Sequence, residues 1–265
     1  MSMFPPERIV CLTEETVETL YLLGRQDRIV GISGYTVRPP EARRDKPRVS
    51  AFTSADLGKI AALRPDIILA FSDMQADIVA TLIRHGFAVH TFNQRDIAGI
   101  FDMIRTLGAL VDARDVAETL VNTYRRGIAD ARDRAARLTI KPRVFFEEWD
   151  EPSISAIRWV SELMEIAGGI DVFADRSHAA DAKGRIVTGE AVIAAAPDIV
   201  IGSWCGKKFR PERLAARPGF AAIPAVRERH LFEIKSSIIL QPGPAALTDG
   251  LAAIEQIVRD WSVAR

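Results

Sequence analysis

The sequence has little of what marks several common protein classes. Only two cysteines occur, Cys11 and Cys205, with no second thiol or histidine at metal-finger spacing, which excludes a disulfide-rich scaffold and a zinc finger. The two thiols either form one long-range disulfide or, as we expect, stay unpaired. No apolar run approaches the roughly 20 residues that cross a bilayer, so the chain is not expected to be membrane-embedded. Residues 1–8 lack the apolar run and cleavage site of an export signal, which leaves a cytoplasmic location open.

Net charge and catalytic motifs are missing as well. The 35 basic side chains balance 35 acidic ones, so no global field gathers polyanions and no nucleic-acid partner is expected. The chain contains no Gly-x-Gly-x-x-Gly turn after a strand, no Walker-type phosphate loop and no Gly-x-Ser-x-Gly elbow. These absences argue against an enzyme and against a bound cofactor.

What the chain does contain is an internal echo. Residues 57–73 (LGKIAALRPDIILAFSD) and residues 189–205 (GEAVIAAAPDIVIGSWC) both run from a helical pattern through a Pro-Asp pair into a short aliphatic run. Aliphatic residues without alternation predict a central parallel strand that is covered on both faces. We expect the proline to stop the helix and the aspartate to occupy an exposed turn. The echo therefore predicts two related α/β halves.

Each half also begins in the same way. Residues 8–12 and 143–146 have strand-like patterns, and the helical patterns that follow, at 16–24 and 159–169, end in glycines suited to C-caps. Between the halves, residues 112–138 place apolar side chains at steps of three or four, including Val116, with Asp112 as the expected N-cap. We predict an N-terminal lobe (1–111), a linking helix (112–140) and a C-terminal lobe (141–265).

Ligands of parallel sheets bind beyond the carboxyl ends of the strands, so two facing sheets would bring their strand-end loops into one cleft. Trp149 and Trp204, which are flanked by polar residues, are expected in this cleft, whereas Trp159 begins a helical pattern and is expected in the core. The residues expected to bind ligand are Thr13, Glu15, Tyr35, Phe52, Phe71, Gln75, Glu148, Trp149, Trp204, Lys207 and Lys235.

Two charged segments lie near these loops. The acidic cluster at residues 147–151 has the ligand types for a hard cation, but no histidine lies nearby, so we expect a solvated or hydrogen-bonding loop and no metal. The basic patch of Lys207, Lys208 and Arg210 either meets carboxylates or phosphates of a ligand or is a solvated loop.

A family likeness is carried by residues 8–13, Glu18, Leu23-Gly24, residues 29–35, Pro39-Pro40, residues 57–68 and Gly86. With this pattern the chain resembles the class III periplasmic substrate-binding proteins of ABC transporters for vitamin B12 and iron siderophores, and it is most similar to the vitamin B12-binding branch. The resemblance implies two Rossmann-like α/β lobes with mostly parallel sheets, joined by one long α-helix.

The resemblance also implies a monomer in the periplasm that holds cobalamin, another corrinoid or a ferric siderophore and delivers it to an ABC permease. Phe52 and Phe71 match positions at which that branch has cleft tryptophans, and Asp77 matches an acidic position that docks on the permease. An alternative from another class is a cytosolic chelatase-like enzyme or ligand-handling protein that acts on a tetrapyrrole or metal, with Glu148 or His178 as the residues to test.

Overall fold

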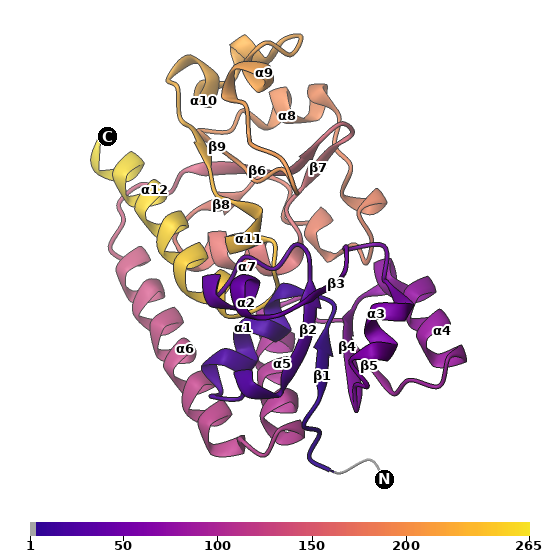
Figure 1. Cartoon of the computed structure of the whole chain (residues 1–265). Coiled ribbons are helices and arrows are strands. Elements are labelled where there is room, and N and C mark those ends of the chain that lie inside the picture. Colours follow the sequence, from indigo (N-terminus) through magenta and orange to yellow (C-terminus); the bar gives the residue numbers. More distant parts are fainter. Residues whose placement is uncertain (1–3) are drawn as a thin grey trace. The chain divides into compact units, whose positions relative to one another are not determined.

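The computed structural model describes residues 4–265, and the chain divides into two units (Figure 1). Unit 1 consists of Met1–Gln94 and Ala98–Thr123, and unit 2 of Arg95–Ile97 and Tyr124–Arg265. Residues 1–3, which open the stretch that lacks an export-signal pattern, lie outside the described residues. Each unit holds one five-stranded sheet, as the two echoing halves predicted. The division into a lobe of residues 1–111, a linking helix of residues 112–140 and a lobe of residues 141–265 stays a prediction.

Unit 1 contains a fully parallel sheet in the order β3-β2-β1-β4-β5. The strands are β1 (Ile9–Cys11), β2 (Ile29–Ser33), β3 (Arg48–Ser50), β4 (Ile67–Phe71) and β5 (Val89–Phe92). The helices are α1 (Glu14–Leu22), α2 (Pro40–Asp45), α3 (Leu57–Ala62), α4 (Ala76–Arg84) and α5 (Ile97–Leu110). The strand order reverses between β1 and β4, which makes this pair the topological switch point of the sheet.

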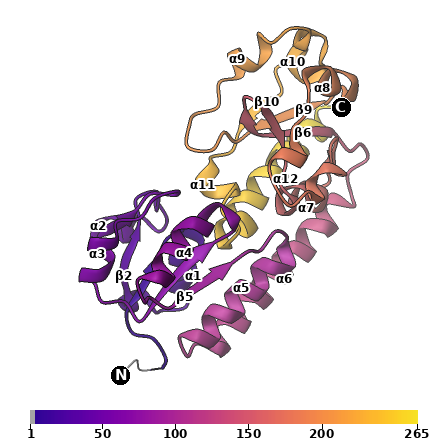
Figure 2. The same ribbon diagram turned by 90° about the vertical axis from the view of Figure 1, so that its right-hand side faces the viewer.

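Helices cover both faces of this sheet (Figure 2). On one face, Val10 and Ile68 pack with Ile60 of α3 in a buried cluster that also includes α4. On the other face, α1 lies against β1 and β2 and is joined to α5, where the Thr19 hydroxyl lies 3.8 Å from the Met103 sulfur. The aliphatic run of β4 is therefore buried on both sides, as its lack of alternation predicted.

Unit 2 contains a mostly parallel sheet in the order β10-β9-β6-β7, with β8 paired to β6 and only β7 antiparallel. The strands are β6 (Arg143–Asp150), β7 (Ser153–Ser155), β8 (Ile170–Asp171), β9 (Ile199–Gly202) and β10 (Leu231–Glu233). The helices are α7 (Arg158–Ile166), α8 (Gly189–Ala195), α9 (Pro211–Ala215), α10 (Pro224–Arg227), α11 (Ser236–Ile239) and α12 (Leu251–Val263).

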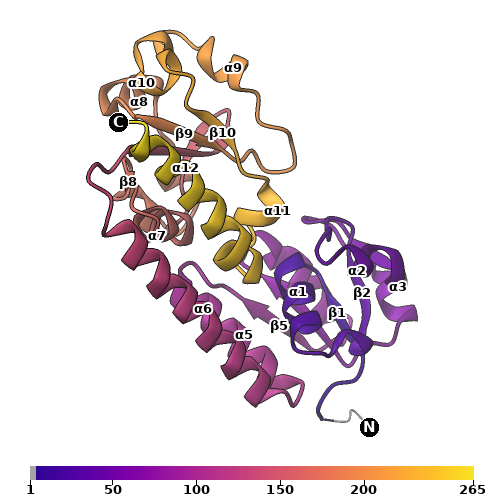
Figure 3. The same ribbon diagram turned by 90° about the vertical axis from the view of Figure 1, so that its left-hand side faces the viewer.

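The core of unit 2 also lies on both faces of its sheet. Phe145 and Val200 belong to a buried cluster formed with α8, α9 and α10. Val144, the residue before Phe145 in β6, points to the opposite face of the sheet. There, a Cβ atom added to Gly169 would lie 3.0 Å from the Val144 side chain. On that side α12 packs against α7 and runs beside the second half of α6 (Arg114–Ala135), with an ion pair of 2.9 Å between Arg134 and Glu255 (Figure 3).

The two echoing Pro-Asp segments form the same pattern of hydrogen bonds to the neighbouring strand. The carboxylate of Asp66 accepts a hydrogen bond of 2.9 Å from the main-chain nitrogen of Arg8, and that of Asp198 accepts one of 2.9 Å from Arg143. Both arginines donate from their guanidinium groups to main-chain carbonyls at the end of the helix before the turn. The expectation of an exposed aspartate is wrong, because each aspartate is half-buried and fixes the start of the neighbouring strand.

The predicted linking helix is present as α6, which contributes residues to both units. It begins two residues after Asp112, whose φ of 54° puts it in the preceding turn, so the predicted cap is wrong. Val116, which we expected on the buried stripe, is 45% exposed. Other predicted positions of the stripe, Ala117, Tyr124 and Ile128, are buried, together with Val121, which the pattern did not include.

Candidate functional site

At the switch point of unit 1, two of the predicted ligand-binding residues are buried. Thr13 is 2% exposed and Glu15 is 0% exposed, and the Thr13 hydroxyl donates to a Glu15 carboxylate oxygen. Glu14, next to them, accepts a hydrogen bond of 3.2 Å from the main-chain nitrogen of Val37. Burial raises the pKa of Glu14 to about 8 and that of Glu15 to about 7. These carboxyl groups can therefore gain or lose a proton close to neutral pH.

Gln75 ties three strand-end segments of unit 1 together. Its side-chain oxygen accepts from the main-chain nitrogen of Phe71 at 3.1 Å, and its side-chain nitrogen lies 2.9 Å from the carbonyl of Phe52 and 3.4 Å from that of Leu12. The side chain is 0% exposed. Gln75 thus positions the loops, while Phe52 is half-buried and Phe71 is buried.

Two other predicted residues of unit 1 lie on its surface. Tyr35, just after β2, is 60% exposed. Asp77, in the first turn of α4, is also exposed. Both side chains are accessible to a partner molecule.

In unit 2, Glu147 at the switch point of β6 and β9 is the centre of a buried network. It is 0% exposed and accepts hydrogen bonds from the Ser153 hydroxyl at 2.6 Å, from Trp204 Nε1 at 2.9 Å and from the Arg217 guanidinium at 2.5 Å. No local pattern could reveal the pair with Arg217, because the two residues are 70 positions apart.

The other carboxylates of the acidic cluster are paired as well. Glu148 binds Arg185 at 2.5 Å, and Arg185 is itself only 3% exposed. Asp150 forms an ion pair with Lys207; burial opposes ionisation of Asp150, but the hydrogen bond and charge of Lys207 outweigh it and hold the pKa below its usual value. Of the two expected forms of this cluster, the hydrogen-bonding one is therefore present and the solvated one is not, because Glu147 and Asp150 have buried side chains and each carboxylate is paired with a cation.

The tryptophans of unit 2 differ in their surroundings. Trp149 is half-buried, and the Lys207 ammonium lies 3.9 Å above its ring. Trp204 is only 2% exposed, with its ring edge-on to Phe209 at 5.1 Å, so it is more buried than its polar sequence neighbours suggested. Trp159 is 2% exposed, which confirms it as a core residue.

A pocket of about 550 Å³ lies at the carboxyl ends of β9 and β10. It brings together three of the residues predicted to bind ligand, Trp204, Lys207 and Lys235, with Lys208 of the basic patch. The volume lies within the roughly 300–1,000 Å³ of small-molecule sites. The remaining lining residues are Gly206, Glu233, Ile234, Ser236 and Ser237.

The remaining reactive groups of residues 4–265 are thiols and possible metal ligands. Both cysteines are free, as expected. Cys11 is buried and Cys205 is exposed. The part of the chain that the structure describes holds no group of three or more His, Cys, Asp or Glu side chains arranged to bind a metal ion. Within the same residues, no helix combines the length and apolar character needed to span a bilayer.

The chain is similar to known proteins over nearly its whole length. It is 26% identical to the vitamin B12-binding protein of Vibrio cholerae over 271 residues, which covers 99% of this chain and 91% of that protein. The solved structure of a periplasmic heme-binding protein from Roseiflexus sp. RS-1 superposes with a TM-score of 0.80 and 25% identity, covering 95% of this chain and 99% of that one. The periplasmic vitamin B12-binding protein of Vibrio cholerae gives a TM-score of 0.75 at 23% identity, over 97% and 98% of the two chains.

The sequence also matches the family model described as periplasmic binding protein, over residues 9–238. This match spans both sheets and confirms the family resemblance. The bilobed α/β architecture of the solved relatives agrees with the two parallel-type sheets found in this chain. The chain belongs to the periplasmic binding protein family.

Proposed function

We propose that this chain is the substrate-binding protein of an ABC transporter, and that it holds a corrinoid or a ferric chelate, haem included, at the carboxyl ends of its parallel strands. The observation that carries the proposal is the pocket at the ends of β9 and β10, which joins Trp204 to three lysines at a place where parallel sheets bind ligands. The names of relatives that bind vitamin B12 or heme support the same ligand classes.

The chemistry of the edge suits a large, flat metal chelate. Trp149 offers a half-buried aromatic ring beside the pocket lysine Lys207, and aromatic rings cover apolar ligand area at low entropic cost. In unit 1, the half-buried Phe52 and the exposed Tyr35 supply the corresponding aromatic surface.

We further propose that the chain acts as a monomer without catalysing a reaction, in the periplasm, and that Asp77 docks on a permease. The chelatase-like alternative has less support. Glu148, one of the two residues it relies on, is held by the buried cation Arg185 and is not available as a general base or metal ligand. His178, the other, is exposed at the end of a short helical turn (Arg176–His178).

The test is a titration of the full chain with cyanocobalamin, haemin and a ferric siderophore, followed by tryptophan fluorescence and by co-elution of the coloured ligand in gel filtration. We expect saturable quenching with at least one of the three. Trp149→Ala should weaken that binding, whereas Phe4→Ala, which removes a ring that is 76% exposed, should leave it unchanged. Absence of binding by every member of the set would contradict the proposal.

A further inference from the structure

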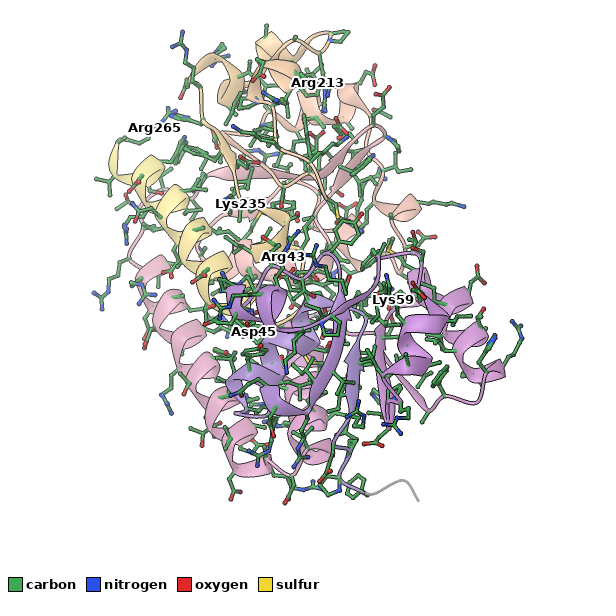
Figure 4. All side chains as sticks on the ribbon, in the orientation of Figure 1. Arg43, Asp45, Lys59, Arg213, Lys235 and Arg265 are labelled. Atoms are coloured by element: carbon green, nitrogen blue, oxygen red, sulfur yellow. The ribbon has the colours of Figure 1, made fainter. Side chains whose placement is uncertain are left out.

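The pocket of unit 2 has an unusual distribution of charge. Lys207 and Lys208 lie in the loop after β9. Lys235, which is labelled in Figure 4, follows β10. Glu233 is the only carboxylate among the lining residues, and its Oε1 already accepts a hydrogen bond of 2.9 Å from the main-chain nitrogen of Phe209. The lining therefore carries more positive than negative charge.

The three lysines are not equivalent. Lys207 is committed to Asp150 by an ion pair and lies over the ring of Trp149. Lys208 and Lys235 are exposed, and within residues 4–265 neither ammonium group has an ion-pair or hydrogen-bond partner. An ammonium group donates up to three hydrogen bonds and accepts none. These two side chains are thus available to an acceptor that enters the pocket.

Hydroxyl donors and apolar surface complete the lining. Ser236 and Ser237 are half-buried at the pocket and add hydroxyl groups that can donate to an oxyanion. Ile234, which is 3% exposed, and Trp204 provide apolar wall. This combination fits a ligand that presents an acidic substituent on an otherwise apolar body.

We propose that this pocket is an anion subsite, in which Lys208 and Lys235 bind an acidic substituent of the ligand. The inference rests on the proposed function and makes it more specific, because it selects ligands that carry oxyanions over neutral ones. The substituent is either a carboxylate, as in the propionates of haem, or the phosphodiester of the nucleotide loop of a cobalamin. Charge-assisted hydrogen bonds to either oxyanion are stronger than those between neutral groups.

The first experiment compares three probes with the wild-type chain. Haemin carries carboxylates, cyanocobalamin carries a phosphodiester, and dicyanocobinamide carries neither. We expect haemin or cyanocobalamin to bind more tightly than dicyanocobinamide, and which of the two binds identifies the source of the oxyanion. Tightest binding of dicyanocobinamide would overturn the subsite.

The second experiment uses Lys208→Gln and Lys235→Gln, with Lys141→Gln as the matched control. Lys141 is also an exposed lysine of unit 2, but it lies before β6, at the amino edge of the sheet. Each pocket variant should bind the acidic probe about tenfold more weakly, because it loses a hydrogen bond from a charged donor. Added salt should reduce the difference in affinity for the acidic probe between the wild-type chain and the pocket variants, because the lysines are exposed and their charges are screened.

The outcomes separate the two proposals. If the wild-type chain binds an acidic probe and both pocket variants match Lys141→Gln, the anion subsite is wrong while the proposed function stands. If the wild-type chain binds none of the three probes nor a ferric siderophore, both proposals fail. Thermal unfolding of each variant shows whether a loss of binding reflects a loss of folded protein.

Discussion

Arg217→Met tests the buried ion pair that supports the carboxyl edge of unit 2. The substitution removes the cation that is hydrogen-bonded to the Glu147 carboxylate and keeps an apolar stem of similar length. Among residues 4–265, Glu147, which is 0% exposed, then retains the Ser153 hydroxyl and Trp204 Nε1 as its side-chain partners. A buried carboxylate that loses its counter-charge destabilises the folded state, because water cannot replace that charge.

The magnitude follows from the burial of each partner. Removing one member of a buried pair costs about 3–5 kcal/mol of unfolding free energy. The Arg217 side chain is 21% exposed, so water partly screens the pair and the lower end of this range, about 3 kcal/mol, is expected. Because Trp204 Nε1 donates to the same carboxylate, the tryptophan environment should change together with the stability.

The assay is equilibrium urea unfolding, followed by circular dichroism and tryptophan fluorescence. Arg213→Met is the matched control, since the Arg213 side chain is 63% exposed and lies 4.0 Å from Asp150. That surface contact should contribute no more than about 1 kcal/mol. Adding Glu147→Gln to Arg217→Met should restore more than half of the loss, because the amide is neutral and still accepts from Trp204. Equal losses for Arg217→Met and Arg213→Met would refute the reasoning.

Three further predictions concern Glu14 of α1, Gly202 of β9 and Gly127 of α6. Because burial raises the pKa of Glu14 from 4.5 to about 8, the folded chain binds more protons than the unfolded chain, so this group makes stability fall as pH rises from about 4.5 to about 8. In urea unfolding, Glu14→Gln should show a smaller drop in unfolding free energy between pH 5 and pH 8 than the wild-type chain. Equal drops in the two proteins would contradict this prediction. Gly202→Ala should destabilise by about 1–3 kcal/mol, because its Cβ would lie 2.0 Å from the ring of Phe209. Gly127 lies in an exposed part of α6, and a Cβ atom added there would have no atom within 4 Å. Gly127→Ala should therefore stabilise the fold by about 0.5–1 kcal/mol. Thermal unfolding of both glycine variants measures the two effects.

Features set by neighbouring residues could be predicted from the sequence. The strands after Pro65 and Pro197 follow from a proline that stops a helix and an aliphatic run that must be buried, and both signals lie within a few residues. The glycines Gly24 and Gly168 adopt positive φ angles of 67° and 90° at the ends of α1 and α7, as their cap positions predicted. These signals fixed the two sheets and much of their order along the chain.

Features that depend on distant partners could not be predicted. The polar neighbours of Trp204 suggested a surface ring, but Phe209 and Glu147 bury it, and Glu147 lies 57 residues away. In the same way, the position of Gln75 after β4 suggested a ligand contact. Its side-chain amide is instead hydrogen-bonded to main-chain groups, one of which, the carbonyl of Leu12, is 63 residues away in the sequence. Strand-end position predicts which residues gather at an edge, but it does not say which of them face a ligand.

The two carboxyl edges neutralise their buried acids in different ways. β1 and β6 hold corresponding places beside the Pro-Asp strands. A pair of glutamates, Glu14-Glu15, opens α1 just after β1, and another, Glu147-Glu148, lies in the second half of β6. In unit 1, burial raises the pKa of Glu14 to about 8 and that of Glu15 to about 7, so protons neutralise each carboxylate below its own value. In unit 2, arginines neutralise them: Arg217 forms an ion pair with Glu147 and Arg185 forms one with Glu148. The acids of unit 2 therefore do not cancel the charge of its free lysines, which is why selectivity for an anionic substituent belongs to this unit.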